Sequence, residues 1–65
     1  MTLLTLYGID GQRDWHVIVP QDTPYYRLRA VRQVTLAGGR IEGLDGIEAK
    51  PFDQARTLAG ALVVA

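Results

Sequence analysis

Hydrophobic and polar residues alternate along two stretches near the start of this 65-residue chain. In residues 2–9, Leu4 and Leu6 fall on one side, and residues 15–19 repeat the pattern with a tryptophan and two valines. A period of two residues is that of a half-buried β-strand. The pattern therefore predicts two strands, and Asp10-Gly11 between them is typical of a tight hairpin turn.

The longest stretch with strand character runs from Tyr25 to about Ala37, and we expect it to form one long, bent strand. Its apolar side carries alternate residues, Leu28, Ala30, Val34 and Leu36. Arg27 and Arg29 then project from the opposite face. Arg32 falls on the apolar side, so a bulge near Ala30–Arg32 would be needed to swing it outward.

The last third of the chain predicts a turn, a short strand and a helix. Gly38-Gly39 is typical of a hairpin turn and leads into a short strand at residues 40–42. Pro51 is tolerated at the first position of a helix and is expected to open one. The apolar stripe of that helix repeats at helical spacing, through Phe52, Ala55, Leu58, Ala59 and Leu62. We expect the helix to stop near residues 59–62 and the tail to be extended or frayed.

These elements predict a single small domain over residues 1–65, mainly β with one short C-terminal helix (α+β). We expect a compact antiparallel structure of four or five strands. Its predicted core is Leu4, Leu6, Trp15, Val17, Leu28, Val34, Leu36, Ile41, Phe52 and Leu58. A chain this short has little stability to spare, and it has no cysteine for a disulfide. The apolar tail at residues 61–65 therefore favours a homodimer or a higher homo-oligomer.

Composition narrows the possible chemistry. Seven basic and seven acidic residues give no net charge, which argues against generic binding to polyanions. Serine and cysteine are absent and His16 is the single histidine, so no Ser–His or Cys–His pair can form and a zinc site would be poor. We therefore expect no enzyme, no metal and no cofactor. A membrane helix needs roughly 20 apolar residues, and no run approaches this length. The N-terminus also lacks signal-peptide features, so we expect a cytoplasmic protein.

The residues best suited to binding lie between Thr23 and Ile41, where no acidic residue occurs. On a strand, Arg27 and Arg29 would lie about 7 Å apart, close to the spacing of successive phosphates. An exposed tyrosine beside them could stack on a base. The candidate ligand-binding or nucleic-acid-binding residues are Tyr25, Tyr26, Arg27, Arg29, Arg32 and Arg40.

Four short motifs resemble those of the WYL domain. Trp15–Val19 is similar to the Trp-Tyr-Leu core that names this family, and Tyr25–Leu28 is similar to its following Phe-Arg-Leu strand. Val31–Leu36 resembles the continuation of that strand, and Lys50–Asp53 resembles the Pro-x-x-Phe-Asp stretch before the terminal helix. The resemblance spans about residues 3–58. It implies a small, Sm-like, partly open β-barrel that senses a nucleotide or nucleic acid within a transcriptional regulator.

Three functions remain open from the sequence. The first is a non-enzymatic regulatory module resembling a WYL domain, which binds a nucleotide or single-stranded nucleic acid through a basic and aromatic strand face. The second is a small protein-binding inhibitor or adaptor of a phage or mobile element, for example anti-CRISPR-like, that uses a strand edge or the apolar tail. The third is a virion or assembly subunit. Salt-dependent binding to oligonucleotides, a complex with a host protein, and self-assembly would favour the first, second and third respectively.

Overall fold

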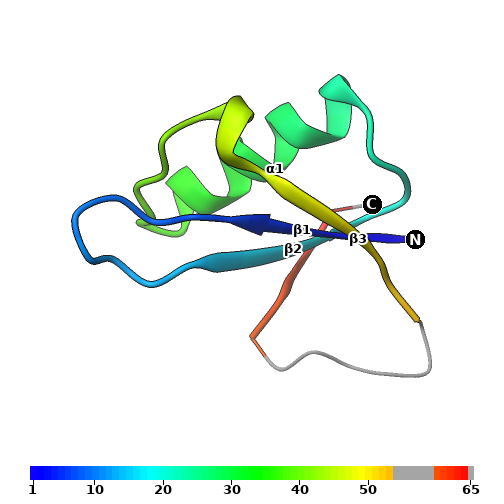
Figure 1. Ribbon diagram of the computed structural model, residues 1–65, viewed down its shortest axis with the longest axis horizontal. Coiled ribbons are helices and arrows are strands. Elements are labelled where there is room, and N and C mark those ends of the chain that lie inside the picture. Colours follow the sequence, from blue (N-terminus) through cyan, green and yellow to red (C-terminus); the bar gives the residue numbers. More distant parts are fainter. Residues whose placement is uncertain (54–59, 65) are drawn as a thin grey trace.

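The structure is a computed structural model, and it describes residues 1–53 and 60–64. The described residues form two layers, a four-stranded sheet and one α-helix that lies across one face of the sheet (Figure 1). The elements are β1 (Thr2–Leu6), β2 (Trp15–Val19), α1 (Pro24–Leu36), the 3-10 turn η1 (Leu44–Gly46), β3 (Glu48–Pro51) and β4 (Leu62–Val63). The predicted fold class, mainly β with one helix, is confirmed, and the sheet does not close into a barrel.

The predicted hairpin between β1 and β2 is confirmed. The two strands pair antiparallel, and Leu4 lies opposite Val17 while Leu6 lies opposite Trp15. Asp10 and Gly11 both have positive φ, 56° and 77°, as a tight connection between twisted strands requires. Because facing residues share one side of the sheet, Leu4 and Val17 are both fully buried beneath α1.

The outer strands make the sheet mixed and not antiparallel throughout. The strand order is β3-β1-β2-β4. Strand β3 pairs antiparallel with β1, whereas β4 pairs parallel with β2. The extended tail is confirmed, and it packs into the chain's own core, since Val64 is 2% exposed and its N–H donates to the Ile18 carbonyl at 2.9 Å. Homo-oligomerisation stays a prediction, and Val63 of this tail is 66% exposed.

The segment predicted as a long bent strand is instead the 13-residue helix α1. Thr23 caps its N-terminus, because the Thr23 hydroxyl accepts a hydrogen bond from the Tyr26 N–H at 3.3 Å. Pro24 occupies the first turn, where its missing N–H costs nothing. Ala30 and Val34, one helical turn apart, are fully buried against the sheet. The segment therefore follows the four-residue spacing of a buried helix face and not the two-residue alternation that predicted a strand.

Gly38-Gly39 ends this helix and does not turn a hairpin. The Gly39 N–H donates to the Val34 carbonyl at 2.8 Å, and the Gly38 N–H donates to the Thr35 carbonyl at 3.1 Å. This pair of bonds is the Schellman motif, which needs a left-handed residue, and Gly38 supplies it with φ of 91°. The strand predicted at residues 40–42 is reduced to a single bridge between Gly8 and Ile41.

The predicted core is confirmed in part. Leu4, Leu6, Val17 and Val34 are buried, and Trp15 and Ile41 pack against them. Leu28 and Leu36 were expected in the core but are 54% and 76% exposed, because a helix turns them away from the face that holds Ala30 and Val34. Outside the predicted set, the core also contains Val19, Ala30, Ile47 and Val64.

The prediction that a helix begins at Pro51 is wrong. Pro51 is the last residue of β3 and lies opposite Thr2 of β1. Phe52 is partly buried, and its N–H donates to the Met1 carbonyl at 3.1 Å. Residues 54–59, including the predicted core residue Leu58, lie outside the described residues.

Candidate binding surface

Five of the six candidate binding residues lie on α1, and the helix distributes them around its axis. Tyr26 turns inward and packs against the core. Tyr25, Arg29 and Arg32 face outward, and all three are exposed. Arg40 lies beyond the end of the helix, where its carbonyl accepts from the Ile9 N–H at 3.0 Å. The single strand face expected from the sequence is therefore replaced by separate surfaces.

One surface combines exposed apolar and basic side chains, and we call it the outer α1 face. It consists of Tyr25, Leu28, Arg29, Arg32 and Leu36, which follow one another at steps of one, three or four residues. Such spacing places them on one side of a helix. Tyr25, Leu28 and Leu36 are 59%, 54% and 76% exposed. A shallow groove of about 290 Å³ runs between Tyr25, Leu28, Arg29, Arg32 and Gln33.

Within this face, Arg29 is held against Tyr25. Arg29 Nη1 donates to the Tyr25 hydroxyl at 2.8 Å, and the Arg29 Cζ atom lies 5.5 Å from the centre of the Tyr25 ring. Tyr25 in turn contacts the Tyr26 ring edge-on, with centres 5.1 Å apart. A guanidinium has five N–H donors, so the single bond to Tyr25 leaves others available to an external acceptor. The contact orients Arg29 without neutralising its charge.

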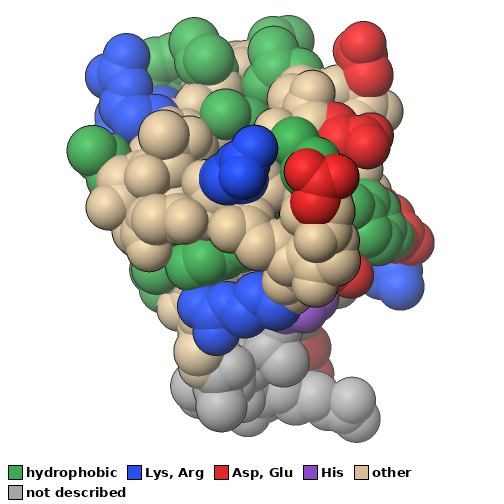
Figure 2. Space-filling view, turned by 90° about the vertical axis from the view of Figure 1, so that its left-hand side faces the viewer, with side chains coloured by type: hydrophobic (Ala, Val, Ile, Leu, Met, Phe, Trp, Pro, Cys, Tyr) green, Lys and Arg blue, Asp and Glu red, His purple; other side chains and the backbone are tan. Residues whose placement is uncertain are grey.

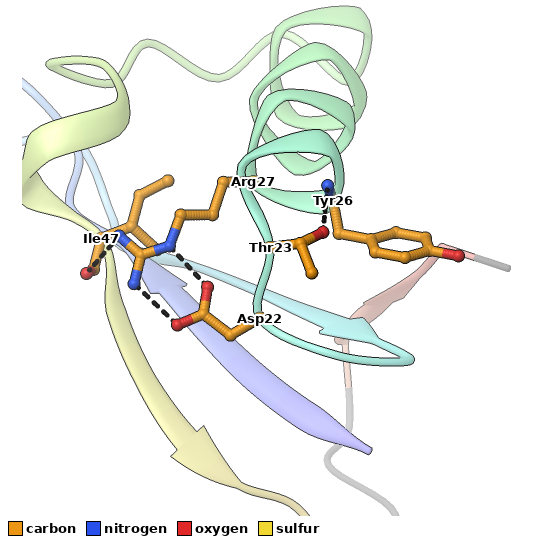
Figure 3. A network of polar contacts seen from close by, with 5 residues as sticks. All are labelled: Asp22, Thr23, Tyr26, Arg27 and Ile47. Atoms are coloured by element: carbon orange, nitrogen blue, oxygen red, sulfur yellow. Dashed lines mark hydrogen bonds and ion pairs between the residues drawn. The ribbon is translucent and has the colours of Figure 1, made fainter.

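Arg27 belongs to a different environment, shown in Figure 3. Its Nε and Nη2 atoms contact the two carboxylate oxygens of Asp22 at 2.6 and 2.9 Å, and its Nη1 donates to the Ile47 carbonyl at 3.5 Å. The hydrogen bond from Arg27 lowers the pKa of Asp22 below its ordinary value. Arg27 therefore has a carboxylate partner within the chain and ties the start of α1 to Ile47.

A second groove, of about 390 Å³, lies beside this ion pair. It is lined by Asp22, Thr23, Pro24, Arg27, Leu44 and Asp45. Arg27, the one cation among the described residues of its wall, is paired with Asp22, and Asp45 adds a further negative charge. This groove consequently offers no net attraction to a phosphate or carboxylate.

Trp15 is an anchor between the sheet and the end of α1. The guanidinium of Arg13 lies over its ring, with the Cζ atom 4.1 Å from the ring centre. Gly39 packs so closely against the indole that a Cβ at position 39 would lie 2.7 Å from Trp15 Nε1. That nitrogen is buried and has no hydrogen-bond partner within residues 1–53 and 60–64. These contacts hold the ring against the core, in agreement with the place of Trp15 among the predicted core residues.

Polar side chains on and next to β1, β2 and β3 contact one another. Thr5 Oγ1 lies 3.3 Å from His16 Nδ1. The Tyr7 hydroxyl donates to the Glu48 carboxylate, which also contacts Lys50 Nζ at 3.4 Å. This hydrogen bond raises the pKa of Tyr7 and lowers that of Glu48. In the described part of the chain, no three His, Asp or Glu side chains are grouped in a way that could hold a metal ion.

Charges are segregated on the surface despite the zero net charge. In Figure 2, most acidic side chains gather on the right of the view, while most basic side chains lie at its left and centre. The segment from Pro24 to Leu36 contains three arginines and no acidic residue. The outer α1 face is therefore a locally basic surface on a neutral protein.

Signals for this helix were present in the sequence, although the surface itself was not predicted. Thr23-Pro24 is a capping pair and Gly38 a stop signal, and together they bracket a helix. Two of the motifs that resemble the WYL domain, Tyr25–Leu28 and Val31–Leu36, lie on this helix and not on strands. No helix within the described residues has the length and apolar character to cross a membrane. No protein-family model, curated protein or solved structure matches this chain, so the resemblance to the WYL domain stays a prediction.

Proposed function

We propose that this protein is a non-enzymatic binding module that docks a partner protein on the outer α1 face. The observation that carries the proposal is the exposure of Leu28 and Leu36, at 54% and 76%, on the same side of α1 as Tyr25, Arg29 and Arg32. The opposite side of the helix is already occupied by the sheet, through Ala30 and Val34. α1 thus has one face for its own fold and one that is available to a partner.

The chemistry of this face matches that of protein interfaces. Tyrosine and arginine are over-represented among the residues that contribute most to binding free energy. Exposed apolar side chains gathered on one surface mark interaction sites more often than isolated ones do. Covering such side chains contributes about 25 cal/mol for each Å² removed from water. Tyr25, Leu28 and Leu36 supply apolar area, while Arg29 and Arg32 supply orientation.

A nucleic acid as the main partner has weaker support. Arg27, which was predicted to share a strand face with Arg29, instead forms an ion pair with Asp22. Phosphates gain nothing from the two exposed leucines, and affinity for nucleic acid depends on the number of phosphates that cations neutralise. The groove beside Tyr25 keeps nucleotide or oligonucleotide binding as a measurable alternative.

Site-specific photocrosslinking in cells of the source organism tests the proposal. A photoreactive phenylalanine replaces Leu28 or Leu36 on the outer α1 face, and in the control it replaces Leu44, which is similarly exposed at 42% but lies on η1. We expect a crosslinked protein band of defined mass from positions 28 and 36 that the control does not give. The band should resist nuclease and disappear with protease.

Two outcomes would overturn the proposal. Equal crosslinking from position 44 would mean that the outer α1 face has no special role. A product that nuclease removes would show that the partner is a nucleic acid, in agreement with the first of the three functions open from the sequence.

A further inference from the structure

We infer that the partner presents an acidic protein surface, with carboxylates that meet Arg29 and Arg32 and apolar side chains that cover Leu28 and Leu36. This inference rests on the proposed function and specifies the chemistry of the partner. It follows from where the arginines lie within the outer α1 face.

Along the helix axis, the two arginines lie between Tyr25 and Leu36, the first and last residues of that face. At 3.6 residues per turn, Tyr25, Arg29, Arg32 and Leu36 form a narrow stripe along the helix, with Leu28 on one flank. No acidic residue of α1 lies beside them to neutralise their charge. Arg29 is additionally oriented by its hydrogen bond to Tyr25 at 2.8 Å. A partner that covers the leucines must also cover both guanidinium groups, and burying a charge without a counter-charge is unfavourable.

A second copy of this chain does not meet that requirement at the same face. Two outer α1 faces packed against each other would bring the arginines of both copies together. Because α1 contains no carboxylate, the helix of neither copy could neutralise the arginines of the other. Like charges in close contact oppose association.

A lipid surface is also a poor match. Membrane-bound amphipathic helices carry arginines on a polar face that is separate from a continuous apolar face. Here Arg29 and Arg32 lie between Tyr25 and Leu36 along the same stripe, so inserting the apolar side chains would force the arginines toward the acyl chains. A protein surface can instead place a carboxylate at each arginine and an apolar side chain at each leucine.

Three synthetic helical peptides test the inference. They share one leucine stripe and differ only in the residues beside it, which are all Glu, all Gln or all Lys. Binding to the intact, isotopically labelled chain is followed by NMR titration of its amide signals. We expect the Glu peptide to bind about tenfold more tightly than the Gln peptide, as two exposed ion pairs would give, and the Lys peptide to bind least. The largest shifts should fall on residues 25–36.

Charge reversal makes the test specific to the two arginines. R29E/R32E should lose affinity for the Glu peptide and gain affinity for the Lys peptide, whereas R40E, a charge reversal outside the face, should leave the ranking unchanged. If the double reversal does not fold, as judged by its amide spectrum, R29Q/R32Q should reduce the preference for Glu over Gln to about unity.

Several results would overturn the inference. The Glu and Gln peptides could bind with equal affinity, or the amide signals that shift could be confined to the sheet. R29E/R32E could still prefer the Glu peptide over the Lys peptide. The chain could also bind anionic phosphatidylserine vesicles more tightly than the Glu peptide. A protein crosslink from position 28 that persists in R29Q/R32Q would leave the binding module in place while removing the acidic partner. The two proposals can therefore fail separately.

Discussion

Gly39→Ala should destabilise this protein strongly, although it adds one methyl group. A Cβ at Gly39 would lie 2.4 Å from Val34 Cγ1 and 2.7 Å from both Cε2 and Nε1 of Trp15. Neither neighbour can move easily, because Val34 is fully buried and Trp15 is covered by Arg13. Forcing extra volume into a packed core costs about 1–3 kcal/mol. A 65-residue chain has roughly 3–10 kcal/mol of total stability, so the loss is a large fraction.

Urea unfolding followed by the fluorescence of Trp15, the one tryptophan in the chain, measures this effect. For a urea slope near 1 kcal/mol per M, a loss of about 2 kcal/mol lowers the midpoint by about 2 M. Gly46→Ala is the matched control, because a Cβ there meets no atom within 4 Å. Equal midpoints for the two variants would refute the packing of Gly39 against Trp15. An emission maximum unchanged by Gly39→Ala would contradict it as well.

Three further predictions concern the contacts that hold α1 and Trp15 in place. Thr23→Ala removes the side chain that caps α1 and should cost about 1 kcal/mol, whereas Thr23→Ser should retain most of the stability; equal losses in urea unfolding would argue against the cap. Because Arg27 lowers the pKa of Asp22, the ion pair stabilises the native state above the ordinary aspartate pKa, about 3.9, and this contribution is lost as the pH falls through the lower folded pKa. The excess stability of the wild type over Asp22→Asn should therefore shrink from about pH 6 to about pH 2.5, and a constant difference would contradict the pair. Arg13→Ala should cost about 0.5–1 kcal/mol through the lost contact with the Trp15 ring and should increase quenching of its fluorescence by acrylamide; unchanged quenching would contradict the stacking.

The opposite roles of the two faces of α1 make function separable from stability. Ala30 and Val34 are fully buried, so substitutions there should act on folding. Leu28 and Leu36 are mostly exposed, so replacing them by polar residues should leave the unfolding free energy within about 0.5 kcal/mol of the wild type. A loss of partner binding without a loss of stability is the signature to look for in such variants.

Much of this protein could be read from the sequence. The alternation in residues 2–19, interrupted by Asp10-Gly11, determined the β1–β2 hairpin and placed Leu4 and Val17 in the core, because a strand with one buried face needs little more than a period of two. The prediction of a basic and aromatic cluster around Tyr25 and Arg29 followed from the absence of acidic residues between Thr23 and Ile41. The capping signals of α1 were also present in the sequence, in Thr23-Pro24 and in Gly38.

Between residues 24 and 36 the local pattern fits two periods. Ala30 and Val34 satisfy both the alternation of a strand and the four-residue step of a helix. Tyr25-Tyr26 and the β-branched residues favour a strand, whereas the caps favour a helix. The sheet decides between them, because the segment packs across it as a helix. Ala30 and Val34 then complete the core formed by Leu4 and Val17, and Leu28 and Leu36, which a strand would bury with them, stay exposed.

The candidate site depends on that decision. As a strand, the segment would have placed Arg27 beside Arg29 and buried the two leucines. As a helix, it turns Arg27 toward Asp22 and leaves Leu28 and Leu36 in solvent with Arg29. The sequence by itself determined which residues could form a binding surface. Which of them share a face was decided by the tertiary structure, because the direction of a side chain depends on the backbone period that burial against the sheet selects.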